Sequence, residues 1–159
     1  MLPRQGPNEN DKSQRRFRVL PLTLDTGEVL PTLVDAGSWI PVRVATRWVI
    51  RRRRWRSMPS TLVNDLRSIG LLYSWASSAL EGDWDDLLEN RHPITGLQID
   101  DLLAFLRVGG RVVDINHATI SGSNTVARHA SVIRDFLKWA VDLTSQGRSQ
   151  VVSFDEILG

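Results

Sequence analysis

The sequence predicts a mainly helical domain, a bundle of four to five helices preceded by a short β-hairpin. Two apolar runs flank an Asp-Thr-Gly-Glu turn within residues 17–34, which is typical of a hairpin. From residue 41 onward, apolar side chains recur at three- and four-residue intervals, as in amphipathic helices. With 159 residues, of which 42% are hydrophobic, the chain is long enough for one domain with its own core.

The first forty residues divide into a tail and a hairpin leader. Residues 1–16 are polar, contain proline and glycine and show no period, so we expect a flexible tail. Residues 17–40 form the expected leader. Pro21 and Pro31 lack the N–H group that a central strand needs, which predicts that both strands lie at sheet edges.

The helical domain is expected over residues 41–146. Pro41 suits the first position of a helix, and the Met58-Pro59 pair should end that helix because proline disfavours helix in the residue before it. Ser60 is then expected to cap a second helix that runs to about Leu80.

Three further helices follow. Asp83 is placed to cap a short helix over 84–88, and Thr95 to cap one over 97–107 that Gly109 and Gly110 end. Residues 108–122 should form a loop. Ser123 opens the last long helix, which we expect to end near residue 145, with 147–159 as a linker toward a domain that this chain does not contain.

The second and last helices repeat one pattern. STLVNDLRSIGLLYSWA (60–76) and NTVARHASVIRDFLKWA (124–140) each begin with a polar residue followed by Thr and end in Trp-Ala. Any two amphipathic helices share some likeness, but the repeated polar entrance lies where helix N–H groups are free to meet an anion. The expected core positions are Leu62, Leu66, Ile69, Leu72, Tyr73, Trp75, Ala76 and Leu80 in the first and Val126, Ala130, Ile133, Phe136, Leu137, Trp139 and Ala140 in the second.

Charge is unevenly distributed along the chain. The net charge is only +2, but residues 1–60 hold twelve basic and five acidic side chains, whereas residues 61–159 hold eight basic and thirteen acidic ones. No acidic residue occurs over 36–64, and six arginines lie within 47–56. Such a run is often a solvated face or a membrane-surface helix, but without acidic neighbours three or four residues away it favours an external polyanion.

These features predict a surface that binds DNA through phosphates. The predicted DNA-binding residues are Arg43, Arg47, Arg51, Arg52, Arg53, Arg54, Arg56, Ser60, Thr61, Asn64, Arg67, Ser123, Asn124, Thr125, Arg128 and Lys138. For the polar residues at the two helix entrances, plain capping is the competing interpretation.

Other classes of site have little support in the sequence. The chain has no cysteine, so it has neither disulfides nor thiolate metal ligands, and a reducing cytoplasm fits. No apolar run is long enough to span a membrane. Capping and solvation account for the acidic segment 81–86 more simply than a metal does. We therefore expect no cofactor, metal, catalytic residue or small-molecule substrate.

The helical segments resemble a known family. STLVNDLRSIGLLYSWA, DWDDLLEN (83–90), QIDDLLAFLR (98–107) and NTVARHASVIRDFLKWA occur in the order found in the N-terminal core-binding (SAM-like) domain of tyrosine recombinases, the phage-integrase family. The resemblance covers about residues 42–143. It implies one half of a C-shaped clamp on duplex DNA, which can also contact other recombinase protomers in a synaptic complex.

The catalytic half of that family is expected to be absent from this chain. The family uses a His-x-x-Arg motif and a nucleophilic tyrosine. Here none of the three histidines is followed by such an arginine, and Tyr73, the only tyrosine, lies on an apolar stripe. The resemblance thus implies DNA binding for site-specific recombination or integration in a bacterial or phage setting, without catalysis by this chain. The alternative is a helical module that binds a partner recombinase or another protein, with incidental DNA affinity.

Overall fold

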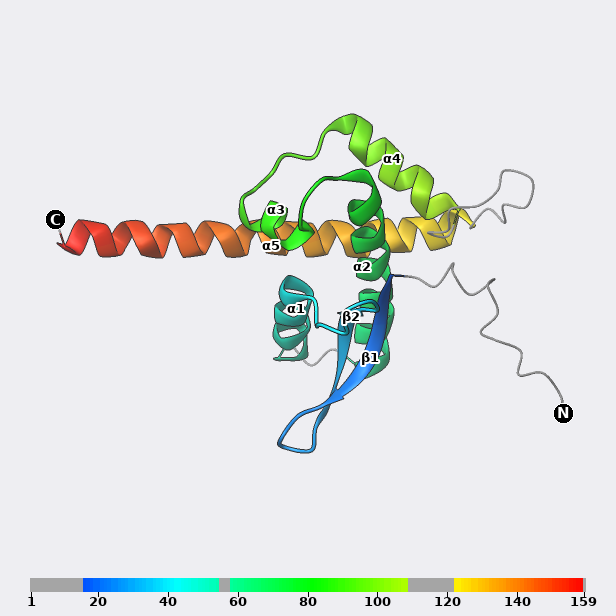
Figure 1. The fold of residues 1–159 in the computed structure, drawn as a ribbon, viewed down its shortest axis with the longest axis horizontal. Helices are drawn as coiled ribbons and strands as arrows, with labels where there is room; N and C mark the ends of the chain where they lie inside the picture. Colours follow the sequence, from blue (N-terminus) through cyan, green and yellow to red (C-terminus); the bar gives the residue numbers. More distant parts are fainter. Residues whose placement is uncertain (1–15, 55–57, 109–121, 159) are drawn as a thin grey trace, which may run out of the picture.

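The computed structural model describes residues 16–54, 58–108 and 122–158, with their side chains except at 53–54 and 143–158. The fold is mainly helical and begins with a two-stranded hairpin, which confirms the predicted class (Figure 1). The elements are β1 (Phe17–Thr23), β2 (Val29–Asp35), α1 (Arg43–Arg54), α2 (Pro59–Ala79), α3 (Trp84–Glu89), α4 (Gly96–Arg107) and α5 (Ser123–Leu158). The predictions for the tail up to residue 15, for residues 55–57 and for the loop over 109–121 lie outside the described residues.

The hairpin forms where its turn residues predict it. The N–H of Leu24 donates to the carbonyl of Glu28 over 2.8 Å, and Gly27 takes a φ of 81°, which glycine adopts without strain. Pro21 lies directly opposite Pro31 in the antiparallel register. The two prolines thus share one rung of the ladder, where neither needs to donate a hydrogen bond.

The outer edge of β2 is covered by the chain that leads into α1. Asp35 N–H donates to the carbonyl of Ile40 over 3.0 Å, and Val42 N–H donates to the carbonyl of Leu33 over 2.8 Å. Pro41 therefore bridges to β2, and α1 begins two residues later at Arg43. The prediction that Pro41 starts the helix is wrong, because the ladder continues through that residue.

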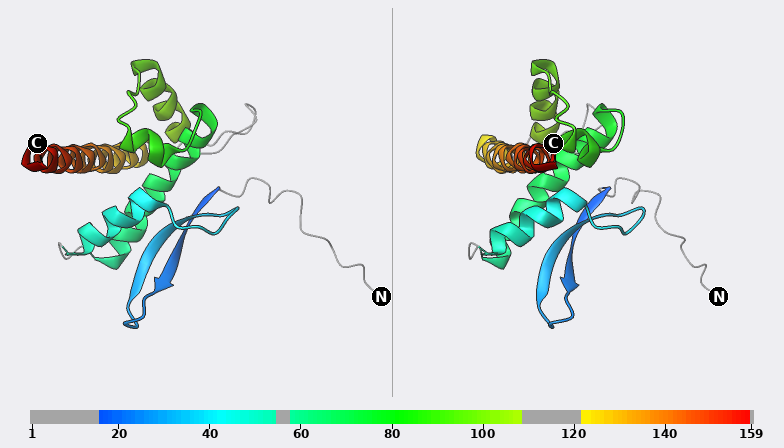
Figure 2. Two further views of the ribbon diagram at one scale, coloured as in Figure 1. Left: turned by 60° about the vertical axis from the view of Figure 1, so that its left-hand side comes forward. Right: turned by 90° about the vertical axis from the view of Figure 1, so that its left-hand side faces the viewer.

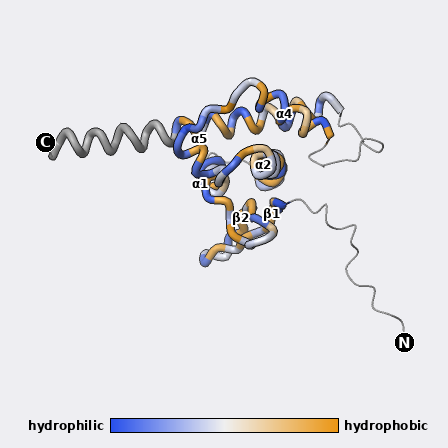
Figure 3. The backbone as a smooth tube through the Cα atoms, turned by 45° about the horizontal axis from the view of Figure 1, so that its top comes forward, coloured by the Kyte–Doolittle hydropathy of each residue, from blue (hydrophilic) through white to orange (hydrophobic). Residues whose placement is uncertain are grey.

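Helix α2 is the centre of the domain. The hairpin, α1, α4 and α5 all pack against it, and the views of Figure 2 place the hairpin on one side of α2 and α5 on the other. Figure 3, which looks nearly along α2, shows the same order. Ten residues of α2 are buried, among them the predicted stripe from Leu62 to Ala76. Gly70 permits the close approach of the hairpin, since a Cβ there would lie 3.2 Å from Leu33 Cδ1.

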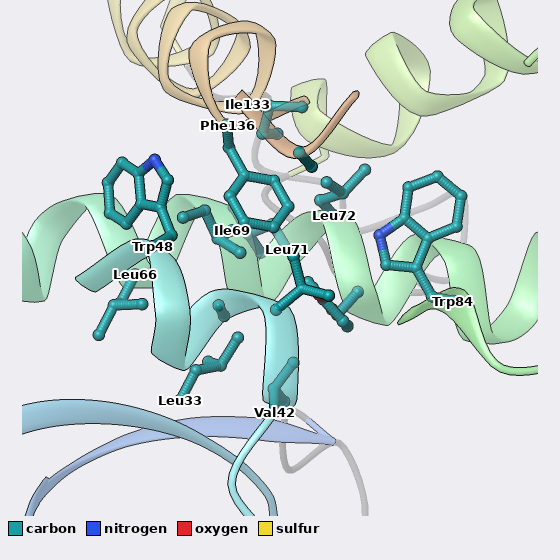
Figure 4. Close-up of a cluster of buried hydrophobic side chains, with 14 of the residues drawn as sticks. Leu33, Val42, Trp48, Leu66, Ile69, Leu71, Leu72, Trp84, Ile133 and Phe136 are labelled. Atoms are coloured by element: carbon teal, nitrogen blue, oxygen red, sulfur yellow. The ribbon is translucent and has the colours of Figure 1, made fainter. Parts of the chain in front are cut away.

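The core joins side chains from every layer. Figure 4 shows Leu33 of β2, Trp48 of α1 and Phe136 of α5 converging on the apolar face of α2. The Trp48 and Phe136 rings meet edge to face with centroids 6.1 Å apart. Burying such aromatic and aliphatic side chains supplies most of the drive to fold, at about 25 cal/mol for each Å² of apolar surface.

Two of the three predicted side-chain helix caps are present, and the third is not. Asp83 accepts from the N–H of Asp86, and Thr95 forms a reciprocal capping box with Gln98. Ser60, however, does not cap α2. The N-cap is Met58, without a side-chain hydrogen bond, because Pro59 occupies the first turn and places Ser60 inside the helix.

Helix α5 is longer than the sequence suggested. It runs from Ser123 to Leu158, so the segment over 147–159 that we expected as a linker is helical through Leu158. The segment over 143–158 contains one glycine, Gly147, and no proline. A lone glycine weakens a helix by about 1 kcal/mol and does not end it.

Candidate nucleic-acid interface

Helix α1 presents one apolar face and one basic face. Val44, Ala45 and Trp48 are buried in the core, whereas Arg47 and Arg51 are exposed. The two arginines are four residues apart and therefore lie one above the other, about 6 Å apart along the helix. Within the described part of the chain neither has an acidic partner. The same exposed side carries Ile50, which is 42% exposed and was not among the predicted site residues.

Arg52 belongs to the border between the basic face and the core. Its guanidinium lies 5.3 Å from the centroid of the Trp48 ring, and its Nη2 is 3.6 Å from Oδ2 of Asp65 on α2. Along α1 itself no acidic residue lies three or four positions from Arg52, as the sequence indicated. The carboxylate comes from α2, which packs against α1.

Asp65 connects three helices electrostatically. Its side chain is only 13% exposed. Burial raises the pKa of Asp65, and this effect exceeds the opposing attraction of Arg52 and, more weakly, of Arg128 on α5. A carboxylate thus lies among the arginines of the predicted DNA-binding set and reduces the positive charge there.

Arg43, at the other end of α1, is bound to acidic residues. Its Nη2 is 3.3 Å from Oδ1 of Asp86, and its Nε is 3.2 Å from Oε1 of Glu89, both on α3. The hydrogen bond to Asp86 and the charge of Glu89 raise the pKa of Arg43. Arg43 was predicted to contact DNA, but its guanidinium already has two carboxylate partners within the protein.

A buried carboxylate holds the start of α1 in place. Asp85 is buried and accepts hydrogen bonds from the hydroxyl of Tyr73 and, over 3.3 Å, from the N–H of Val44. Burial raises the pKa of Asp85 and outweighs the hydrogen bond from Tyr73, which acts in the opposite direction. The same burial, together with the charge of Asp85, raises the pKa of Tyr73 well above 10.0.

The acidic segment 81–86 therefore has structural roles that fit the capping interpretation. Asp83 caps α3, Asp85 supports α1 and Asp86 pairs with Arg43. Over the described ranges, no group of three or more histidine and carboxylate side chains is arranged to hold a metal ion.

The entrance of α2 is polar and exposed. Ser60, Thr61, Asn64 and Arg67 all face solvent in part or fully, and Nη1 of Arg67 donates to Oδ1 of Asn64 over 3.2 Å. Arg67 also lines a groove between α2 and β1, on a different side of α2 from Asp65. Arg67 therefore does not share one continuous surface with the arginines of α1, whereas Thr61 lies one turn from Asp65, which pairs with Arg52.

The entrance of α5 is likewise exposed but is fixed to α2 beside it. Nδ1 of His129 lies 2.7 Å from Oγ of the buried Ser68 on α2. The predicted residues here are all exposed: Ser123, Asn124, Thr125, Arg128 and Lys138. Arg128 lies near enough to Asp65 to lower its pKa, so α1, α2 and α5 meet around that carboxylate.

Two predicted residues lie in α1 without described side chains, and one lies outside the described residues. Arg53 and Arg54 continue α1, while Arg56 falls in the segment 55–57. Asp65 and Asp85 also determine this surface, and the sequence did not predict either of them in that role. No local signal marks them, because each acts on a residue more than ten positions away in the chain.

No protein-family model, no curated protein and no solved structure matches this chain. None of the helices in the described ranges combines the length and the apolar character that crossing a membrane requires.

Proposed function

We propose that this domain binds duplex DNA, chiefly through phosphates, with the exposed side of α1 as the main contact. The exposed Arg47–Arg51 pair, without an acidic partner in the described part of the chain, is the observation that carries the proposal. Arginine suits this role because its planar guanidinium offers several donors to a phosphate. Contacts of this kind position a protein on DNA without reading its sequence.

The surroundings of the pair support a positioning surface. Trp48 and Val49 are buried and fix α1 on the core, so Arg47 and Arg51 project from a helix that is held in place. Arg52 adds a third cation beside them, partly offset by Asp65. The exposed Thr61 and Arg128, at the starts of α2 and α5, would extend the contact to a neighbouring phosphate or base edge.

The resemblance to tyrosine recombinases supplies the wider role in the proposal. The domain would be the core-binding half of a recombinase-like clamp and would position DNA for site-specific recombination or integration in a bacterial cytoplasm. Strand cleavage would fall to a catalytic domain outside this sequence. A protein-interaction module with incidental DNA affinity is the rival.

Fluorescence anisotropy of a labelled random duplex of about 30 base pairs, at several salt concentrations, tests the proposal. If about five phosphates are neutralised, the logarithm of affinity should fall against the logarithm of salt with a slope near −4.5. The double variant R47A/R51A should make that slope less negative by about 1.8, since each lost contact removes about 0.9.

The matched control is R107A/R134A, which removes the same charge from exposed positions on α4 and α5. It should leave the slope within about 0.5 of the parent value. Equal effects of the two double variants, or no duplex binding at low salt, would overturn the α1 assignment. The second outcome would favour the protein-interaction module.

A further inference from the structure

A groove of about 350 Å³ runs between β1 and α2. Its lining includes the apolar residues Phe17, Val19, Leu33 and Leu71 and the basic residues Arg18 and Arg67. None of the residues that line it is acidic. The groove therefore combines an apolar surface with positive charge.

The backbone of β1 beside this groove has an open edge. Residue pairs in an antiparallel ladder alternate between hydrogen-bonded and non-hydrogen-bonded. Pro21 and Pro31 lack N–H groups, so their pair is non-hydrogen-bonded. Every second pair along the ladder is of the same type. The pairs Val19 with Leu33 and Phe17 with Asp35 are therefore also non-hydrogen-bonded.

Observed hydrogen bonds agree with this assignment. The pair that follows, Arg16 with Ala36, is hydrogen-bonded, because Ala36 N–H donates to the carbonyl of Arg16 over 2.7 Å. On β2, the carbonyl of Leu33 and the N–H of Asp35 point away from β1 and bond to the covering segment 40–42. By the same geometry, the N–H and carbonyl groups of Phe17 and Val19 point away from β2.

The two edges of the hairpin therefore differ. The chain itself covers the outer edge of β2, whereas β1 pairs only with β2 in the described part of the fold. Pro21 blocks the far half of the β1 edge. The stretch over residues 17–19, which borders the groove, can accept another strand.

We propose that this edge and its groove bind an extended segment of a partner protein, which adds to β1 as a third strand. Backbone hydrogen bonds to Phe17 and Val19 would hold the segment, and alternate side chains would enter the groove, as in other cases of strand addition. Because the groove is basic and partly apolar, the bound segment should carry an acidic side chain between apolar ones. Arg67 would pair with that acidic side chain.

Two other occupants fit less well. β1 of a second copy contains no acidic residue, so it would bring no carboxylate to Arg67 in the groove. A DNA phosphate could accept from the outward N–H groups, but it has no donor for the carbonyls of Phe17 and Val19 and no apolar group for the lining. The groove also lies apart from the basic side of α1, because α1 packs on β2 and β1 lies beyond it (Figure 1). The inference does not rest on the DNA-binding proposal.

The test uses a fluorescein-labelled peptide, Thr-Val-Thr-Glu-Thr-Val-Thr, and a second peptide with Lys in place of Glu. Alternation turns Val, Glu and Val toward one face of a strand, here the groove. We expect the full chain to bind the Glu peptide saturably and the Lys peptide about tenfold more weakly. Arg67→Glu should reverse that preference, whereas Arg107→Glu, an exposed control on α4, should not.

Amide chemical shifts of the labelled full chain locate the binding. The amides of Phe17 and Val19 should move on titration with the Glu peptide, and R47A/R51A should leave this response unchanged even where it removes DNA binding. No saturation by about 1 mM peptide, shifts confined to α1, or equal binding of both peptides would overturn the proposal. So would duplex DNA that moves the same β1 amides, since it would make nucleic acid the occupant.

Discussion

The two ends of α1 use arginine in opposite ways. At the start of the helix, Arg43 is bound by Asp86 and Glu89, next to the buried Asp85. From its second turn onward, Arg47 and Arg51 project into solvent without an acidic partner in the described part of the chain. The same residue type thus contributes to the fold at one end and to an unneutralised surface at the other.

This difference arises from tertiary structure and not from the helix itself. The start of α1 meets the acidic helix α3, whereas the rest of α1 faces α2 and α5, whose described side chains bring only Asp65 to Arg52. A basic run in a sequence therefore does not tell which of its members remain available to a ligand. The acidic residues that fold back on it decide that.

The largest expected effect is at the anchored end of α1. Asp85→Ala would leave the Tyr73 hydroxyl and the Val44 N–H buried without their acceptor. We expect the free energy of unfolding, measured by urea titration, to fall by about 3 kcal/mol. Asp86→Ala, an exposed neighbour on the same helix, should lower it by less than about 1 kcal/mol. Equal losses would remove the special role of Asp85.

The loss of stability in Asp85→Ala should depend on pH, which gives a second test of the role of Asp85. Because burial raises the pKa of Asp85 above 3.8, the folded state takes up the proton at higher pH than the unfolded state does. Between the two pKa values the parent protein therefore gains stability from this group as pH falls. The Asp85→Ala deficit should be larger at about pH 4.5 than at about pH 7.

The pKa of Asp35 shifts in the opposite direction to that of Asp85. Burial acts to raise its pKa, but the N–H groups of Gly37 and Ser38, together with Arg16, outweigh burial and lower it. Its contribution to stability is present above the unfolded pKa and is lost as pH falls through the folded one. Both proteins keep Asp35, so its effect cancels in the difference. A deficit that shrinks toward low pH would contradict the raised pKa of Asp85.

A smaller effect is expected at Asp65, which offsets Arg52 at the edge of the basic side. Asp65→Asn keeps the shape of the side chain and removes its charge. Because the ionised form is already disfavoured by burial, the free energy of unfolding should change by less than about 1 kcal/mol. Duplex affinity should rise about threefold, since one negative charge leaves the surface. Reduced affinity in the anisotropy assay would show that Asp65 orients Arg52 for binding.

The sequence predicted those parts of the fold that local signals encode. The hairpin turn, the Asp83 cap and the Thr95 cap were all confirmed, because each depends on residues within a few positions. The Ser60 cap was wrong because Pro59 competes for the same turn. The end of α5 was misplaced because the segment over 147–158 contains no proline, and its one glycine, Gly147, does not end the helix.

In the candidate site too, features set by nearby residues were predictable from the sequence, and contacts between distant residues were not. The exposure of Arg47 and Arg51 follows from helical periodicity, since they lie four residues apart and off the line of the buried Val44 and Trp48. The ion pairs of Arg43 and Arg52 join residues between thirteen and forty-six positions apart in the chain. Their acidic partners carry no local mark, so only the folded arrangement reveals them.

The smallest effect, and the most direct test of the comparison, is expected for Arg43→Ala. Both of its ion pairs are at the surface, where solvent screens them, so the free energy of unfolding should fall by only about 0.5 kcal/mol. The salt slope of duplex binding should stay within about 0.5 of the parent value, in contrast to the change of about 1.8 in R47A/R51A. If Arg43→Ala instead shifted the slope by about 0.9, Arg43 would leave Asp86 and Glu89 for a phosphate on binding. The two ends of α1 would then form one DNA-binding surface, and the acidic residues of α3 would compete with DNA for it.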